Sequence, residues 1–199
     1  FDVGNKEKAK ADLYEIKDVD NKYAHPANYY YSHIAYTEKN YQTALDGFNR
    51  LLNNETFGSV VPYYITQNYF SQGKYDEVVK MAPPLLNDSN FVQKKEEINR
   101  IIGESYFKLK DYKNAIPYLL KHNTSSAEDN YQLGYAYYYA GDCDKALPYL
   151  ELASANQDSL AQNAFYHAAG CYLKTNDKTK ARSSFYNAYN LNFDKKIKE

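Results

Sequence analysis

Residues 131–153 read YQLGYAYYYAGDCDKALPYLELA, and this stretch decides the fold. On both sides of Gly141 and Asp142, apolar residues recur at intervals of three and four, which is the period of an α-helix. Glycine and aspartate are residues that end one helix and cap the next. The stretch therefore predicts two helices joined by a tight turn.

The turn motif, residues 141–146 in this stretch, recurs along the chain. It ends in a small residue each time, at Ala9, Ala44, Val78, Ala115, Ala146 and Ala181. Successive copies are 35, 34, 37, 31 and 35 residues apart, and a period near 34 indicates an array of helix pairs. A second column of small residues precedes the motif end by twelve positions, at Ser32, Thr66, Gly103, Gly134 and Ala169. Two such columns allow the helices of a pair to approach closely.

This pattern resembles the tetratricopeptide repeat, whose units have a Leu-Gly pair and a tyrosine in the first helix, and an alanine, an aromatic residue and a second alanine in the second helix. The resemblance is closest at Leu133, Gly134, Tyr137, Ala146, Leu150 and Ala153. The tryptophan that is usual in the first helix is absent. The resemblance implies an all-α fold, a right-handed superhelix (solenoid) of about five stacked helix-turn-helix repeats plus a leading helix.

One solenoid domain is therefore expected over residues 1–199. Its full repeats are expected at 25–58, 59–95, 96–126, 127–161 and 162–194. A partial repeat, mainly a second helix, is expected at 1–24, and residues 195–199 would begin a further helix. Because both ends fall within a repeat, we expect this chain to be a piece of a longer array.

Two spacings depart from the common period. Pro83 and Pro84 predict that the second helix of its repeat ends near Ala82, since proline lacks a donor and clashes with the preceding turn. The 37-residue spacing then reflects an insertion before Phe91. The 31-residue spacing predicts a shortened second helix in residues 96–126.

Composition and motifs exclude several classes of function. With 24 basic and 25 acidic residues, the chain lacks the excess of positive charge that a nucleic-acid binder needs. No apolar run reaches the roughly 18 residues of a membrane-spanning helix. Neither a phosphate-binding loop nor a nucleophile motif is present. None of the histidines has partners at metal-ligand spacing: His25, His33, His122 and His167. We therefore expect no enzyme activity, no catalytic residues, no cofactor and no metal.

The chain has two cysteines, Cys143 and Cys171. They form no CxxC motif, and we expect them to be small core residues. A disulfide between them stays open as an alternative.

The 24 tyrosines fall into two sets in this repeat frame. One set should pack between helices, at Tyr69, Tyr106, Tyr137 and Tyr172. The resemblance places a second set on the concave face, and exposed rings are expected at Tyr29, Tyr63, Tyr131 and Tyr166. The candidate peptide groove comprises Tyr29, His33, Tyr36, Tyr63, Gln67, Phe70, Arg100, Glu104, Tyr131, Tyr135, Tyr138, Tyr139 and Tyr166.

Tyrosine combines a large apolar face with a hydroxyl group, which suits partner recognition. We therefore expect a non-enzymatic scaffold that binds a peptide or protein, with no nucleic acid and no insertion into membranes by this segment. One alternative is an accessory protein for assembly or transport in the bacterial envelope (outer membrane or periplasm). Another is a carbohydrate-binding or regulatory module of a larger protein. The compartment, periplasm or cytoplasm, stays undecided.

Overall fold

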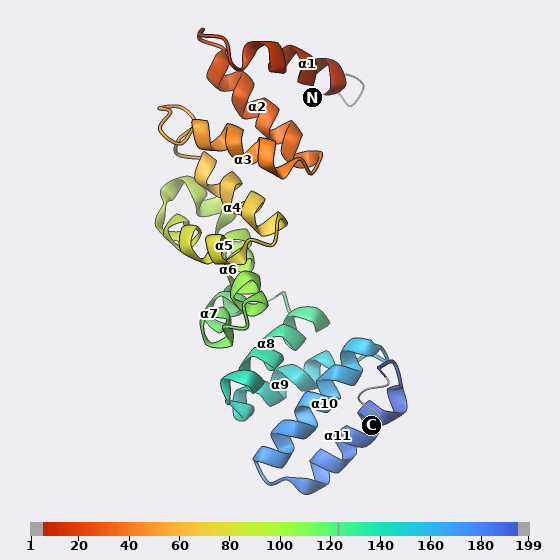
Figure 1. The fold of residues 1–199 in the computed structure, drawn as a ribbon. Helices are drawn as coiled ribbons and strands as arrows, with labels where there is room; N and C mark the ends of the chain where they lie inside the picture. Colours follow the sequence, from red (N-terminus) through yellow and green to blue (C-terminus); the bar gives the residue numbers. More distant parts are fainter. Residues whose placement is uncertain (1–5, 123, 195–199) are drawn as a thin grey trace. The chain divides into compact units, whose positions relative to one another are not determined.

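The computed structural model describes residues 6–122 and 124–194, and the chain divides into two compact units, Phe1–Ile101 and Ile102–Glu199. Within the described ranges, eleven α-helices and two 3-10 helices follow one another without a strand. Figure 1 shows successive helices packed as antiparallel pairs inside each unit. The expected all-α repeat solenoid is confirmed.

The first unit contains three helix pairs or parts of them. Its elements are α1 (Lys6–Ile16), α2 (Ala24–Thr37), α3 (Tyr41–Arg50), α4 (Val61–Ser71), α5 (Tyr75–Met81) and the 3-10 helices η2 (Pro83–Asn87) and η3 (Ser89–Lys94). Helix α6 (Lys95–Lys108) begins in this unit and ends in the second. The second unit continues with α7 (Tyr112–His122), α8 (Ala127–Ala140), α9 (Cys143–Ala153), α10 (Ser159–Lys174) and α11 (Lys178–Leu191).

The turn motif joins the two helices of each pair, and its copies share a backbone conformation. Its first residue has a positive φ in five copies, at Lys39, Gly73, Lys110, Gly141 and Asn176. This left-handed conformation ends the preceding helix. In three copies an aspartate then caps the next helix. The side chains of Asp111, Asp142 and Asp177 accept hydrogen bonds from the backbone nitrogens of Asn114, Lys145 and Lys180. The motif is therefore a structural device of the repeat.

The small columns set the distance between the helices of a pair. A Cβ atom on Gly134 of α8 would lie 2.7 Å from Cγ of Leu150 on α9. On Gly103 of α6 it would lie 3.0 Å from the backbone nitrogen of Leu119 on α7. Both leucines are buried. Glycine at these positions therefore lets the second helix pack directly on the backbone of the first.

The two irregular spacings have different outcomes. As predicted, α5 ends at Met81, and the proline-containing insertion forms η2 and η3. The prediction of a shortened second helix in residues 96–126 is wrong, because α7 has 11 residues, as many as α9. The short spacing arises after α7 instead, since α8 begins at Ala127, soon after α7 ends at His122, and has 14 residues where α10 has 16.

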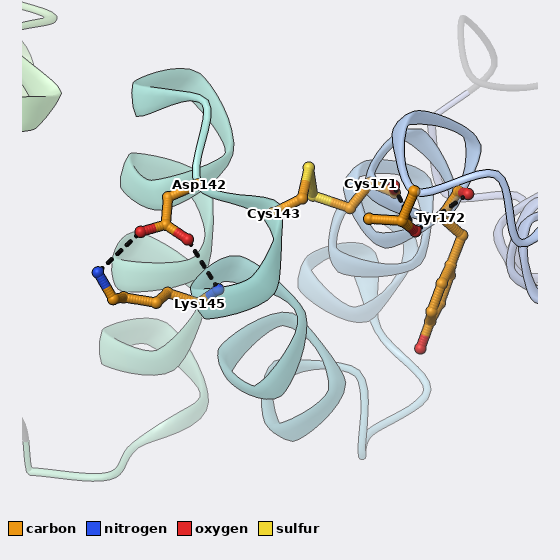
Figure 2. The surroundings of a disulfide bond; sticks show 6 residues. Asp142, Cys143, Lys145, Cys171 and Tyr172 are labelled. Carbon is orange, nitrogen blue, oxygen red and sulfur yellow. Dashed lines mark hydrogen bonds and ion pairs between the residues drawn. A yellow bond between two sulfur atoms is a disulfide. The ribbon is translucent and has the colours of Figure 1, made fainter.

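The structure pairs the two cysteines, so they are more than small core residues. Cys143 at the start of α9 and Cys171 in α10 form a disulfide, with a Cα–Cα distance of 5.2 Å. Both side chains are buried. Figure 2 shows that the bridge joins the second helix of one repeat to the first helix of the next, beside the Asp142–Lys145 ion pair. Sequence spacing alone could not predict this pairing, because it depends on how neighbouring repeats stack.

Candidate peptide-binding face

Aromatic rings gather around His167 in the second unit, on the first helices α8 and α10. The imidazole centroid lies 4.8 Å from the ring centroid of Tyr135 and 5.0 Å from that of Tyr138. Three further rings stand within 6.2 Å. The His167 cluster comprises His167, Tyr131, Tyr135, Tyr138, Tyr139 and Tyr166. These members come from two neighbouring repeats of one unit.

Helical spacing and one glycine build this cluster. Tyr131, Tyr135 and Tyr139 are four residues apart, which puts their rings on one side of α8, with successive centroids 5.6 and 4.5 Å apart. A Cβ atom on Gly170 of α10 would lie 2.8 Å from the hydroxyl oxygen of Tyr138. The absence of a side chain at Gly170 therefore lets the Tyr138 ring lie against α10.

The cluster is uncharged at neutral pH. Burial lowers the pKa of His167 from 6.5 to about 4, so the imidazole is neutral. Burial also raises the pKa of Tyr131 and Tyr135, so their hydroxyls keep their protons. The ammonium of Lys174 lies 4.1 Å from the ring centroid of Tyr138, at the edge of the cluster. The face is thus neutral and aromatic, with the Lys174 ammonium beside it.

Exposure differs between the base and the rim of the cluster. His167 is buried, whereas Tyr139 and Tyr166 are 52% and 42% exposed. Tyr131, Tyr135 and Tyr138 are half-buried. The rim therefore offers ring faces to a ligand while the base holds them in place.

A second aromatic group lies in the first unit around His33. Its imidazole centroid is 4.5 Å from the ring of Tyr29 and 4.2 Å from that of Tyr64. Phe57 stacks on Tyr29 at 4.6 Å, and burial lowers the pKa of His33. Tyr29, His33, Phe57 and Tyr64 are all half-buried, so these four residues include neither a buried imidazole nor an exposed ring like those of the His167 cluster.

The predicted exposure of Tyr63 is wrong, because the ring is only 3% exposed. Phe91 of η3 lies over it, with centroids 5.8 Å apart. The Tyr63 hydroxyl donates a hydrogen bond to Glu97 Oε2 at 2.5 Å, and Gln67 Nε2 donates to Glu97 Oε1 at 2.7 Å. The insertion that follows the two prolines therefore converts this position into part of the core.

The other predicted groove residues are not members of the His167 cluster. In the first unit, the Tyr36 hydroxyl and Ser71 Oγ form a hydrogen bond at 2.9 Å, and the Arg100 guanidinium lies 5.5 Å from the Phe70 ring centroid. Glu104 lies in the part of α6 that belongs to the second unit. Of the four tyrosines expected to pack between helices, Tyr137 and Tyr172 are buried, as expected. Tyr69 and Tyr106 are half-buried.

Sequence reasoning missed His167 and Tyr112. Tyr112 of α7 lies 5.2 Å from Tyr139 and 5.6 Å from Tyr135, measured between ring centroids. Neither residue stands in the columns that the repeat assigns to the concave face. Tyr112 is on a second helix. His167 is on a first helix, where it contacts the tyrosines of α8. Only the stacking of neighbouring repeats brings His167 into the cluster and Tyr112 against its members Tyr135 and Tyr139.

The buried imidazole predicts a pH effect on stability. The unfolded chain binds a proton at His167 near pH 6.5, whereas the folded chain does so only near pH 4. The neutral imidazole of His167 therefore adds its full contribution to the free energy of unfolding above pH 6.5. This contribution is lost as the pH falls from 6.5 toward 4. In urea denaturation across this window, we expect His167→Gln to show a smaller loss of stability than the parent. His25→Gln, at an exposed histidine, is the matched control and should behave like the parent; equal losses in all three proteins would contradict this prediction.

Metal and membrane features are not found in the described ranges. Within residues 6–122 and 124–194, no group of three His, Cys, Asp or Glu side chains could hold a metal ion. Over the same ranges, none of the helices combines the length and apolarity that crossing a bilayer requires.

Comparison with known families agrees with the repeat frame. Residues 131–191, which include α9, α10 and the His167 cluster, match a family model described as Tetratricopeptide repeat. This part of the chain carries a tetratricopeptide repeat. Among curated proteins, none matches this repeat chain.

Solved structures share the fold of this chain. One is YrrB, described as a TPR protein with an unusual peptide-binding site, with a TM-score of 0.75, 20% identity and 96% of both chains covered. Another is a MamA protein from Desulfovibrio magneticus, with a TM-score of 0.64, 17% identity and coverage of 84% of this chain and 94% of that one. At these identities the likeness concerns the fold.

Proposed function

We propose that this tetratricopeptide chain is a non-enzymatic scaffold whose His167 cluster binds a peptide segment of a partner protein. The observation that carries the proposal is the exposed rim formed by Tyr139 and Tyr166 above a buried base. Exposed aromatic rings that their neighbours hold in place lose little entropy when a ligand covers them. The description of YrrB as a protein with a peptide-binding site supports the choice of a peptide as ligand.

The chemistry of the cluster defines the peptide. A neutral face of tyrosine rings favours apolar and aromatic side chains, while protonated hydroxyls can hydrogen-bond to peptide carbonyls. The Lys174 ammonium at the edge would favour a carboxylate on the peptide close to these side chains. We therefore propose a short segment with one or two aromatic or aliphatic anchors and an acidic neighbour.

Alanine substitution at the rim tests this proposal. Peptides are first selected from a random display library on the intact protein, and their dissociation constants are then measured by fluorescence anisotropy. We expect Tyr139→Ala and Tyr166→Ala each to weaken binding about 30-fold, because central aromatic anchors contribute about 2 kcal/mol.

The matched control is Leu152→Ala, at an exposed apolar residue on the second helix α9. Its affinity should equal that of the parent. A failure to select any peptide, or equal affinities for all variants, would overturn the proposal. Glycan binding that is lost in Tyr139→Ala would instead favour the carbohydrate-binding alternative.

The disulfide favours the envelope alternative over a cytoplasmic scaffold. Disulfides persist in oxidising compartments and are rare in the cytosol. Because Cys143 and Cys171 are bonded, we propose that the chain works in an oxidising compartment such as a periplasm. Free thiols at both positions in protein taken from its natural host would contradict this.

A further inference from the structure

A small cavity lies in the first unit between α2, α3 and the connection that follows α1. Its volume is about 150 Å³. Among the residues that line it, Asn28 and Gly47 are buried at the floor, whereas Asp46 and Arg50 are exposed at the mouth. Lys17, just beyond the end of α1, lines it as well. A cavity of this size admits a small organic molecule.

Two facing positions of this repeat explain the cavity, because both lack a large side chain. The Asn28 Nδ2 atom on α2 donates a hydrogen bond to the Gly47 carbonyl on α3 at 3.2 Å, so the two positions lie against each other. A Cβ atom on Gly47 would collide with Oγ of Ser32, which keeps this position free of a side chain. In each of the other four full repeats one of the two counterparts is large, namely Met81, Tyr118, Tyr149 and Phe165.

The cavity is not an open end of the repeat stack. At the same place in the last repeat, between α9, α10 and α11, a surface hollow is lined by Ser154 and Asn187, the counterparts of Lys17 and Arg50. Helix α8, which precedes α9, lines no part of that hollow. By the same repeat geometry, a helix before α1 would leave the cavity between α2 and α3 uncovered. The charged lining is a property of this repeat, since Ser154 and Asn187 are uncharged.

Polar groups that line the cavity keep free hydrogen-bonding capacity. Asn28 is only 6% exposed, yet its Oδ1 accepts no hydrogen bond from the described part of the chain. The hydroxyls of Tyr31 and Thr43, which also line the cavity, form none within residues 6–122 and 124–194. Because buried polar atoms are normally paired, such a set of open groups around one cavity indicates a polar ligand.

Asp46 and Arg50 place opposite charges at the mouth. They stand four residues apart on α3, which puts both on one side of the helix, although the described ranges contain no ion pair between them. Asp46 Oδ1 accepts a hydrogen bond from Gln42 Nε2 at 2.7 Å, and Arg50 Nη1 donates to Asp18 Oδ1 at 2.6 Å. The second carboxylate oxygen of Asp46 and the other guanidinium nitrogens of Arg50 are left for a ligand.

The charge balance favours a ligand that carries both signs. Lys17 adds a second positive charge, but it is paired with Asp18, as Arg50 is. The charges of Lys17, Arg50, Asp18 and Asp46 therefore sum to zero. An anion bound alone would face the Asp46 carboxylate, and a cation bound alone would face the Arg50 guanidinium. A zwitterion satisfies both groups.

We propose that this cavity binds a free α-amino acid with a small side chain, such as alanine or serine. Its carboxylate accepts hydrogen bonds from the Arg50 guanidinium, and its ammonium group donates to Asp46 and to Asn28 Oδ1. Side chains one helical turn apart are about 5–6 Å from each other, a gap that the adjacent charged groups of an α-amino acid bridge. The site lies in the first unit and does not depend on peptide binding at the His167 cluster.

Calorimetric titration of the full chain with L-alanine and two analogues is the direct test. Propionate lacks the ammonium group of alanine, and ethylamine lacks its carboxylate. We expect saturable binding of alanine. Each analogue should bind roughly tenfold more weakly or worse, because it leaves one charged group of the cavity without a partner.

Variants that remove one charge locate the site. Asp46→Asn and Arg50→Gln should each weaken alanine binding roughly tenfold, since each removes a charge-assisted hydrogen bond. Both side chains are exposed, so the urea midpoint should stay close to that of the parent. The matched controls make the same substitutions at exposed residues elsewhere, Asp76→Asn on α5 and Arg182→Gln on α11, and should bind alanine like the parent.

Tyr139→Ala, which tests peptide binding at the His167 cluster, should leave alanine binding unchanged. The proposal is overturned if neither alanine nor serine shows saturable binding to the parent, or if Asp46→Asn and Arg50→Gln bind alanine as tightly as the parent does. Propionate that binds as tightly as alanine would overturn the choice of an amino acid and assign the cavity to small carboxylates.

Discussion

Replacing Cys143 and Cys171 together by alanine is expected to lower the free energy of unfolding of the second unit by about 3.6 kcal/mol. The bond closes a loop with a sequence separation of 28, and removing it restores that loop's entropy to the unfolded chain. Both side chains are buried, so the variant also loses packing between α9 and α10. Urea denaturation followed by circular dichroism measures the change.

Reduction of the parent protein provides the matched experiment. Dithiothreitol should lower the stability of the parent by a comparable amount and should leave the double alanine variant unchanged. A parent protein with the same denaturation midpoint with and without reductant would contradict this prediction, since the bond would then contribute nothing to stability.

Phe48→Ala is expected to destabilise the first unit by about 4 kcal/mol, the usual cost of removing a buried aromatic ring. Phe48 is 1% exposed and its ring centroid lies 5.1 Å from that of His33 and 5.6 Å from that of Tyr64. The loss of the Phe48 ring would leave a cavity beside the aromatic group around His33. The measurement is again urea denaturation, with the near-ultraviolet signal of the tyrosines as a second probe.

Phe185→Ala is the matched control, because it makes the same substitution at the same position of another repeat. Phe185 is partly exposed, so we expect its removal to cost less than about 1.5 kcal/mol. Equal losses for the two variants would contradict the assignment of Phe48 to the core and of Phe185 to an open face.

Much of the fold follows from local pattern. The turn motif predicted the helix pairs, because a left-handed residue such as Gly141 and a capping aspartate such as Asp142 act within a few residues of chain. The small residues predicted close packing, since Gly134 and Leu150 belong to one helix pair and are only 16 positions apart. Pro83 likewise predicted the end of α5 by a local clash.

The candidate site was predictable only in part. Tyr63 and Tyr131 occupy the same position of their repeats, yet one is buried under Phe91 and the other is half-buried beside His167. The sequence locates the insertion that contains Phe91 but does not show onto which ring it folds. His167 likewise joins the cluster through contacts with tyrosines of a different helix pair.

The sequence by itself determined the repeat, the helix pairs and the small columns between them, because turns, caps and close packing within a pair depend on residues near one another in the chain. Tertiary structure alone decided that Cys143 bonds Cys171, that Tyr63 is buried and that Tyr139 and Tyr166 form an exposed rim. Each of these depends on how one helix pair stacks on the next, where the distance between side chains is set by neighbouring repeats rather than by position within one.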